Sequence, residues 1–444
     1  MIKNIKEQVN LLRRSNMIRH NYICSPLINY TQYGIEENCS YLDPDVFPKH
    51  DDNPDLSIAD NISPRFVNFH EIVLALYRNE LNNGKILNFN KILKQASVKY
   101  KEINKKEFEI LKSFSIDIKP NIESEVDSSI NPSIKHITFG STSNEKELCI
   151  GLVNMKLNDY YIEQSYLQNP ILDNKRREQF NSLLNLVRHT EHQIKRKIDI
   201  LVLPELSVPY KALDWLCDYA QRNQLMMIFG VEHWVSKNRA YNLLATLIPF
   251  PLNENSNSEE TFNGLLPLLR IKNHYAPDEE LLLKSYRYTI PKPKPSEYFL
   301  IEWKGAKFSV FNCFELADIQ HRALFRGEVD LLFACEYNAD THYYSNIVES
   351  VVRDLHCYFI QSNNAVNGDS RITRPTKSAT MNQIQIKGGE NISIIVDTID
   401  IENIRNHQIQ NNVGRDKGSF FKPTPPGYEV EKAMNRRGKN LNKK

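Results

Sequence analysis

Short apolar runs alternate with helical segments between residues 146 and 412, and this alternation constrains the fold more than any other feature of the chain. The runs have the length and the apolar composition of buried strands. They begin at Cys149, Ile198, Leu225, Ala240, Leu265, Phe308 and Asp330. Helical patterns lie between several of them, at Lys175–Lys197, Pro209–Asn223, Asp318–Gly327 and Tyr344–Leu355. This order of strands and helices predicts an α/β domain over residues 146–412.

The segments on either side of this domain follow other patterns. A helical signature begins at Asn68, where Glu71 three residues later completes a capping box. Further helical patterns lie at residues 89–100 and 105–114. The outer segments are therefore predicted as an irregular N-terminal segment (1–64), a small helical unit (65–120), a linker (121–145) and a polar, basic tail (413–444).

Composition excludes several classes of protein. Of 444 residues, 41% are hydrophobic and 25% charged, which is typical of a globular protein and not of a disordered chain. No apolar stretch approaches the ~20 residues of a membrane-spanning helix, so we expect a soluble protein with no membrane contact. The net charge of +2 argues against nucleic acid as a partner, although the basic end of the chain keeps that alternative open.

The cysteines and the N-terminus bear on the cellular compartment. The chain has seven cysteines, an odd number, and no CxxC pair. The first residues lack the apolar core of a signal peptide. We therefore expect reduced thiols and a cytoplasmic location. Motifs typical of dinucleotide-binding, P-loop, zincin and serine-hydrolase proteins do not occur in the sequence.

Three residues that could carry chemistry follow apolar runs directly: Glu205 in ILVLPELSVP, Lys272 in LLPLLRIKNH and Cys313 in FSVFNCFEL. Side chains at the ends of strands project into the crevices where α/β proteins place their sites. A carboxylate at such a position is desolvated and suited to proton transfer. A thiol on a sharp turn before a helix would have a pKa lowered toward neutrality by the helix dipole and a nearby ammonium.

Each of the three also has a plainer interpretation. Glu205 could be an acid that caps the helix after Pro209, and Lys272 could be a solvated strand end. Cys313 could be a packing residue, as we expect for the other cysteines of the domain. Lys292 and Lys294 compete with Lys272 for the role of cation, but they lie close to Cys313 in the chain and leave little room for an intervening strand.

Taken together, these motifs resemble the Glu-Lys-Cys triad of the nitrilase or carbon–nitrogen hydrolase superfamily. The separations of 67 and 41 residues between Glu205, Lys272 and Cys313 are similar to the spacing in that family. The resemblance covers residues 146–412 and includes MMIFGVEHW, YNLLATLI and the segment after the cysteine. The chain departs from the family at Phe314-Glu315, where an aromatic residue is often followed by aspartate.

The resemblance implies a four-layer αββα sandwich that assembles into a homodimer or a higher homo-oligomer. It implies that Cys313 attacks a small-molecule amide or nitrile, with Glu205 as the general base and acid. Lys272 and the backbone N–H of Phe314 would stabilise the developing charge, and Glu280, or failing that Glu279, would orient Lys272. No metal and no organic cofactor are needed. The residues expected to contact substrate are Phe314, Glu315, His274, Glu336, Tyr337 and Asn338, with His274 as a hydrogen-bonding wall of the pocket.

Two other functions stay open at this point. An acyltransferase would use the same thioester with an amine in place of water, and the Lys272-to-Glu280 pattern resembles the apolipoprotein N-acyltransferase branch of the family. A nitrilase-like sensor or oligomerisation scaffold in a bacterial multi-component system, such as a defence system, would use the fold without the chemistry. The N-terminal extension of about 145 residues favours an added role of this kind and could bind a protein partner.

Overall fold

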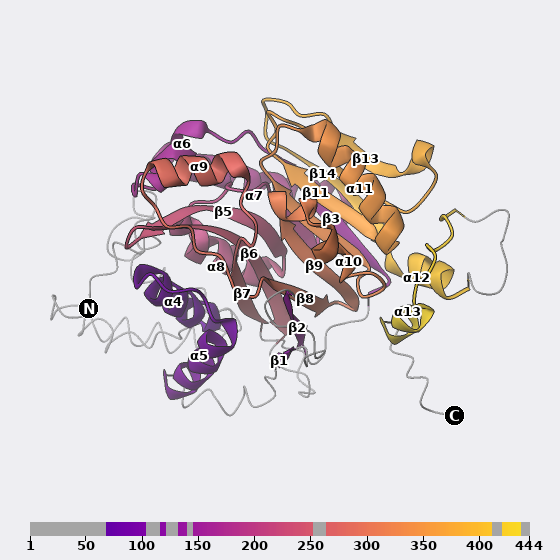
Figure 1. Ribbon diagram of the computed structural model, residues 1–444, viewed down its shortest axis with the longest axis horizontal. Helices are drawn as coiled ribbons and strands as arrows, with labels where there is room; N and C mark the ends of the chain where they lie inside the picture. The colour runs from indigo at the N-terminus through magenta and orange to yellow at the C-terminus, as the bar shows by residue number, and fades with distance from the viewer. Residues whose placement is uncertain are drawn as a thin grey trace.

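Two β-sheets lie face to face at the centre of the molecule, and helices cover both outer faces (Figure 1). The computed structural model describes residues 68–103, 116–120, 132–139, 145–251, 263–410 and 420–436. The predicted N-terminal irregular segment and the helical pattern at residues 105–114 lie outside these ranges.

One sheet has six strands, and three neighbouring strands in it run parallel. The central strands are buried along nearly their whole length, as parallel strands between two layers should be. In spatial order the strands are β14 (Ser393–Asp400), β3 (Glu147–Asn154), β4 (Ile200–Val202), β5 (Met226–Ser236), β6 (Arg239–Pro251) and β7 (Asn263–Ile271).

The other sheet has eight strands, with β9, β10 and β11 parallel at its centre. In spatial order they are β1 (Ile116–Pro120), β2 (Ser133–Phe139), β8 (Glu297–Trp303), β9 (Ala306–Asn312), β10 (Leu331–Glu336), β11 (Tyr358–Asn363), β12 (Ser370–Thr373) and β13 (Asn382–Ile386). β2 lies within the predicted linker, so that part of the linker prediction is wrong. It pairs in parallel with β8 and extends the sheet.

Alternation along the strands divides the core into two layers. In β10, Leu331 and Phe333 face the other sheet, whereas Leu332 packs outward with the buried face of α11 (Thr341–Leu355). Across the interface between the sheets, β3 contacts β11 and β5 contacts β10. Burying one such Leu or Phe side chain stabilises the fold by roughly 1.5–3 kcal/mol. This shared core fixes the position of one sheet against the other.

Helices form the two outer layers. α7 (Asn174–Ile194) contacts β14, and α8 (Leu213–Asn223) contacts β6 and β7. α11 covers the eight-stranded sheet together with the short α10 (Ile319–Ala323). The predicted four-layer αββα sandwich is confirmed.

The N-terminal helices are part of the same body. α4 (Phe69–Asn82) and α5 (Phe89–Ile103) pack against each other, and α4 also packs on β7 and α8. The predicted capping box is present at the start of α4. Arg78 forms an ion pair with Asp214 of α8. The predicted helical unit therefore shares the core of the sandwich, and its last residues form β1 instead of helix.

The C-terminal helices lie on the opposite side of the molecule from α4 and α5 (Figure 1). α12 (Ile401–Gln410) packs with α13 (Val430–Arg436), so the predicted polar tail contains a helix. Its Arg436 forms an ion pair with the buried Asp330. Within the ranges that the structure describes, no helix is both long enough and apolar enough to cross a bilayer. The remaining short elements are α6 (Asp159–Tyr166), α9 (Pro277–Ser285) and three 3-10 turns, η4 (Tyr210–Ala212), η5 (Cys313–Ala317) and η6 (Ser378–Thr380).

Candidate active site

Glu205 lies in a tight turn after β4, at the end of the six-stranded sheet. Leu206 has a φ of 55°, and the chain then passes close to β5. A Cβ on Gly230 of β5 would lie 2.5 Å from the Cα of Glu205, closer than any non-bonded contact allows. Glycine is thus required where β5 passes this turn. The Glu205 side chain is 3% exposed.

Lys272 follows β7 directly and points to Glu205. Its Nζ donates to Glu205 Oε1 at 2.7 Å and to Glu279 Oε2 at 2.7 Å. The side chain is 1% exposed. Burial lowers the pKa of Lys272, but the charges of Glu205 and Glu279 outweigh it and raise the pKa well above its ordinary value. Lys272 is therefore a fixed ammonium held between two carboxylates.

Glu279, not Glu280, orients the lysine, which corrects the first choice made from the sequence. Glu279 lies in the first turn of α9 and also accepts from Asn242 Nδ2 at 2.7 Å. Burial raises its pKa, but Lys272 and a hydrogen bond from His233 overcome this and lower it. Glu280, the next residue along the helix, pairs with Lys284 and Lys292 instead.

Asn242 of β6 joins the parts of the site. Its side-chain nitrogen donates to Glu205 Oε1 at 2.9 Å as well as to Glu279. Its side-chain oxygen accepts from Asn312 Nδ2 at 3.0 Å, and Asn312 is the residue before Cys313. Asn242 thus connects the Glu205 and Glu279 carboxylates with the cysteine turn after β9.

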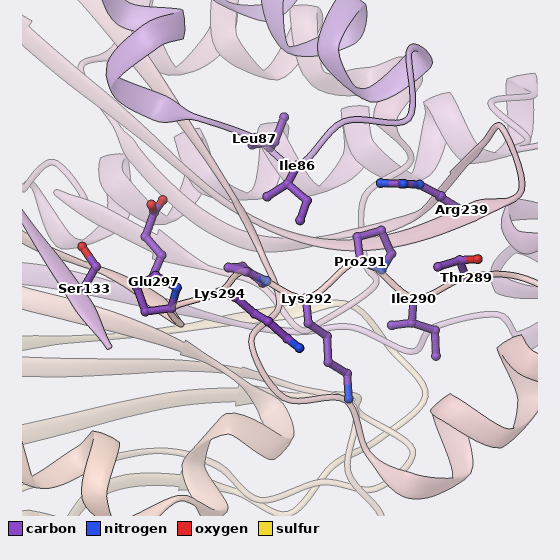
Figure 2. Close-up of a pocket in the computed structure, with 12 residues that line it drawn as sticks. Ile86, Leu87, Ser133, Arg239, Thr289, Ile290, Pro291, Lys292, Lys294 and Glu297 are labelled. Carbon is purple, nitrogen blue, oxygen red and sulfur yellow. The ribbon is translucent and has the colours of Figure 1, made fainter. Parts of the chain in front are cut away.

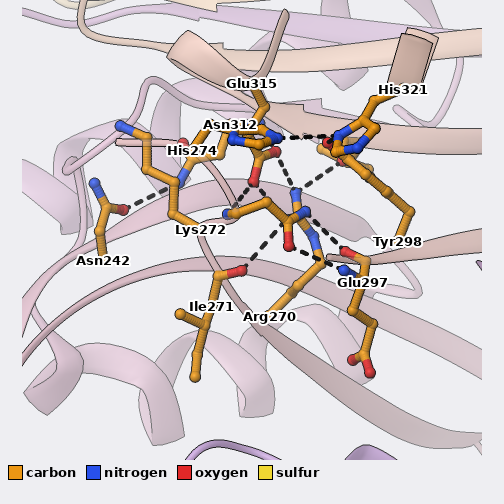
Figure 3. A network of polar contacts seen from close by, with 12 residues as sticks. Asn242, Arg270, Ile271, Lys272, His274, Glu297, Tyr298, Asn312, Glu315 and His321 are labelled. Atoms are coloured by element: carbon orange, nitrogen blue, oxygen red, sulfur yellow. Dashed lines mark hydrogen bonds and ion pairs between the residues drawn. The ribbon is translucent and has the colours of Figure 1, made fainter. Parts of the chain in front are cut away.

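Cys313 begins the 3-10 turn after β9 and has a φ of 46°. A left-handed conformation at a residue other than glycine costs roughly 1–3 kcal/mol and persists only where its surroundings hold it. Glu315 supplies that hold. It accepts the backbone N–H of Asn312 at 2.8 Å and of Asn273 at 2.6 Å, and Arg270 binds it through two nitrogens at 2.6 and 2.7 Å (Figure 3). These bonds occupy both oxygens of Glu315, which corrects its predicted contact with substrate.

The charges of Glu205 and Lys272 both affect the pKa of the Cys313 thiol. Burial raises its pKa well above the ordinary value, and the charge of Glu205 adds to this rise. Lys272 and a hydrogen bond from the Tyr337 backbone N–H oppose it. The predicted lowering of the Cys313 pKa toward neutrality is wrong, because Cys313 is only 6% exposed and the turn that follows is too short to supply a strong dipole. Burial therefore favours the neutral thiol form of Cys313.

Glu336 is the last residue of β10, and its charge affects the pKa of the Cys313 thiol. Neither of its carboxyl oxygens has a hydrogen-bond partner within the described residues. Burial raises its pKa to about 8, with Arg371 opposing and Asp369 and Glu205 adding to the rise. Its backbone oxygen accepts from Glu205 N at 3.3 Å. Glu336 is thus a buried acid beside the turn that carries Glu205, and burial favours its neutral form.

The other predicted contact residues lie around the same turn. Tyr337 donates its hydroxyl to Asp159 Oδ1 at 2.7 Å, and the Asn338 N–H donates to Asn363 Oδ1 at 2.9 Å. Phe314 is partly buried in the 3-10 turn after Cys313.

The predicted wall residue His274 lies beside a second histidine, with its Nε2 3.1 Å from the Nδ1 of His321. With Asp318, these two histidines form the group of described residues that could hold a metal ion.

The competing lysines lie elsewhere. Figure 2 shows Lys292 and Lys294 on the wall of a pocket of about 620 Å³, opposite Ile86 and Leu87 from the segment between α4 and α5. None of Glu205, Lys272 and Cys313 lines this pocket. This supports the choice of Lys272 over Lys292 and Lys294.

Sequence reasoning gave Asn242, Gly230 and Arg270 no role in the site. For Arg270 a signal exists, because an arginine inside the apolar run LLPLLRI is rarely buried without an acid. Its acid, Glu315, is 45 residues away in the chain. The other two give no such signal, since a single Asn or Gly inside a strand has many explanations.

Comparisons with known proteins give matches only among solved structures. No family model matches the chain, and no curated protein matches it. XC1258 from Xanthomonas campestris is similar at 14% identity with a TM-score of 0.42, covering 61% of this chain and 98% of that one. Nit3 from Saccharomyces cerevisiae is similar at 13% identity with a TM-score of 0.42, covering 63% of this chain and 98% of that one. An amidase from Nesterenkonia is similar at 10% identity with a TM-score of 0.39, covering 60% of this chain and 95% of that one.

All three structures are described as members of the nitrilase or CN-hydrolase superfamily. Identities this low assign no role to any residue of this chain.

Proposed function

We propose that the protein is a cysteine-dependent hydrolase of small-molecule C–N bonds, amides or nitriles, of the nitrilase type. The observation that carries the proposal is the buried Lys272 ammonium, which bonds Glu205 and Glu279 and whose charge opposes that of Glu205 in its effect on the pKa of the Cys313 thiol. A fixed cation, a base and a thiol nucleophile in one dry place are the groups that acyl transfer requires.

The first half of the reaction forms a thioester. The S–H proton of Cys313 passes to the Glu205 carboxylate as the sulfur attacks the amide carbon. The oxygen that gains negative charge is stabilised by the Lys272 ammonium and the Phe314 N–H. One such donor contributes about 3 kcal/mol where water is excluded. Glu205 then returns the proton to the leaving nitrogen, and ammonia or an amine departs. A nitrile gives a thioimidate by the same attack.

The second half regenerates the enzyme. Glu205 takes a proton from water as the water oxygen attacks the thioester carbon, and the C–S bond breaks to give the acid product. The proton returns to the Cys313 sulfur. Glu279 is a positioning residue in both halves, because its carboxylate is a second partner of the Lys272 ammonium besides Glu205.

A panel of short aliphatic amides and nitriles tests the proposal in one assay. The full chain is incubated with each compound and ammonia release is followed, with an added amine in a parallel series. We expect ammonia release for at least one class, with the acyl group transferred to water. Acyl transfer to the amine would support the acyltransferase alternative. Absence of both ammonia and adducts from a folded sample would overturn the enzyme proposal in favour of a sensor or scaffold.

A further inference from the structure

Three metal-ligating side chains meet beside the proposed active site without taking part in its chemistry: His274, Asp318 and His321. The His274 Nε2 lies 3.1 Å from the His321 Nδ1 and 3.5 Å from the Asp318 Oδ2. The His321 Nδ1 lies 3.6 Å from the same Asp318 oxygen. Figure 3 shows the two imidazole rings side by side.

These separations match the face of a coordination tetrahedron. Zinc binds imidazole nitrogen and carboxylate oxygen at about 2.0–2.1 Å, which places two ligand atoms about 3.3 Å apart. Two imidazoles on one such ion have their ring centres about 5 Å apart. The rings of His274 and His321 have centroids 4.9 Å apart. The three separations between ligand atoms differ by at most about 0.3 Å from those around one tetrahedral ion.

The surroundings leave the right atoms available. The Asp318 Oδ1 accepts the backbone N–H of Gln320 at 2.9 Å and of His321 at 3.1 Å, which orients the carboxylate and leaves Oδ2 for an ion. The Tyr298 hydroxyl lies 3.0 Å from the His321 Nδ1. The His274 side chain is 36% exposed and the Asp318 side chain 30%, so an ion can enter from solution.

Hydrogen bonds alone explain the arrangement less well. An imidazole Nδ1 that accepts has one lone pair. Both the Tyr298 hydroxyl and the His274 Nε2 lie at donor distance from it. Either the Tyr298 contact or the His274 contact is therefore left without a well-aligned hydrogen bond. An ion would instead use the lone pair of His274 Nε2 and that of His321 Nδ1.

We propose that His274, Asp318 and His321 bind a divalent transition-metal ion of the zinc class. Imidazole suits Zn²⁺, Co²⁺ and Ni²⁺, and a set of two nitrogens and one oxygen leaves a fourth position for water or a further oxygen. His274 lies two residues after Lys272, and Asp318 lies five residues after Cys313. The ion would tie these two segments together and stabilise the frame of the active site, and no step of the proposed reaction passes through it.

Two variants and one control isolate the site. The substitution D318N keeps a side chain that can cap the same N–H groups but removes the charge, and H274Q removes an imidazole that is not part of the core. The matched control is H342Q, because His342 is an exposed histidine outside the cluster. The full chain is stripped with a chelator, and Zn²⁺ and Co²⁺ are titrated by calorimetry and by visible absorption.

We expect one equivalent of Zn²⁺ per chain and tetrahedral Co²⁺ bands, with a rise in melting temperature on binding. Removing a partner of a metal ligand already costs 10–100-fold in affinity, so H274Q and D318N should each lose at least ~100-fold. H342Q should bind as the native chain does. Absence of binding at micromolar Zn²⁺, or binding that H274Q and D318N leave unchanged, would overturn the site. Neither result depends on whether the protein hydrolyses amides.

Discussion

Two buried charge clusters in this molecule differ in how completely their charges are satisfied. Where the C-terminal helices α12 and α13 pack on the sandwich, Asp330 accepts from Arg405 Nε at 2.8 Å and from Arg436 Nε at 3.0 Å. Its Oδ2 also accepts the Lys307 N–H at 2.9 Å. In the cluster of the candidate active site, Glu205 and Glu279 share the Lys272 ammonium. Glu336 and the Cys313 thiol lie beside it, and the Glu336 carboxyl has no partner among the described residues.

The difference separates stabilisation from chemistry. The Asp330 cluster has one acid for two cations, and these cations lie 75 and 106 residues after Asp330 in the chain. Burial raises the pKa of Asp330, but the two arginines overcome this and lower it. The cluster around Lys272 has more carboxyl groups than ammonium groups and lies next to a thiol, and buried groups left unsatisfied in this way are typical of functional sites.

The largest expected effect is on catalysis at Cys313. The substitution C313A should lower amide turnover by at least ~10⁴-fold, because no thioester can form, while the far-UV spectrum and melting temperature stay near those of the native chain. The matched control is C217A, since Cys217 is buried in α8 away from the cluster. If C217A abolished turnover and C313A did not, the nucleophile would have been assigned to the wrong cysteine.

Glu336 should make stability depend on pH in a way that Asp330 does not. The Glu336 pKa of about 8 in the folded chain lies above its ordinary 4.5, so between these values the unfolded chain is ionised and the folded chain is not. Stability should therefore fall as pH rises through this window, by up to about 5 kcal/mol. The variant E336Q lacks this term and should gain on the native chain in urea unfolding between pH 5 and pH 8.

The control for that experiment is D330N. Because the Asp330 pKa is lowered, its contribution is present throughout pH 5–8 and is lost only in acid. The difference between D330N and the native chain should be constant over the window. An E336Q curve parallel to the native one would show that Glu336 has a partner or is ionised.

The same D330N variant should be less stable by roughly 3–5 kcal/mol at neutral pH, because two buried arginines lose their acid. Turnover per folded molecule should not change, since Asp330 takes no part in the active-site cluster. Urea unfolding and activity corrected for folded fraction measure the two effects. A loss of turnover without a loss of stability would contradict the structural role of the Asp330 cluster.

A smaller effect distinguishes two neighbouring acids. The substitution E279Q should lower turnover about 100-fold, because Lys272 loses the carboxylate that positions it. The substitution E280Q should leave turnover within about twofold, since Glu280 bonds Lys284 and Lys292 on the surface. Steady-state kinetics of the pair measure this directly. Equal losses would mean that the first turn of α9 is placed differently.

The sequence predicted the ends of the strands better than the contacts beyond them. Glu205, Lys272 and Cys313 were recognisable because each follows an apolar run. The choice between Glu279 and Glu280 depends on the rotation of α9 about its axis, which a residue pattern beginning at Pro277 does not define. The pKa of Cys313 depends on its burial, and burial is set by chain segments that are distant in sequence.

Strand β2 shows a related limit. Its residues are polar enough to resemble a linker, and only every second side chain near its end is buried. They form a strand because β8 and β1 offer hydrogen-bond partners on either side. A strand of mixed polarity such as β2 owes its conformation to its neighbours in the sheet more than to its own composition.

The central claim is that the Cys313 sulfur, the Glu205 carboxylate and the Lys272 ammonium act as one unit. Rapid quenching of the native chain with a reactive amide, followed by intact-mass analysis and peptide mapping, tests it most directly. We predict a single acyl adduct on Cys313 that disappears in both E205Q and K272M. An adduct on a different cysteine, or one that forms equally fast in both variants, would contradict the account.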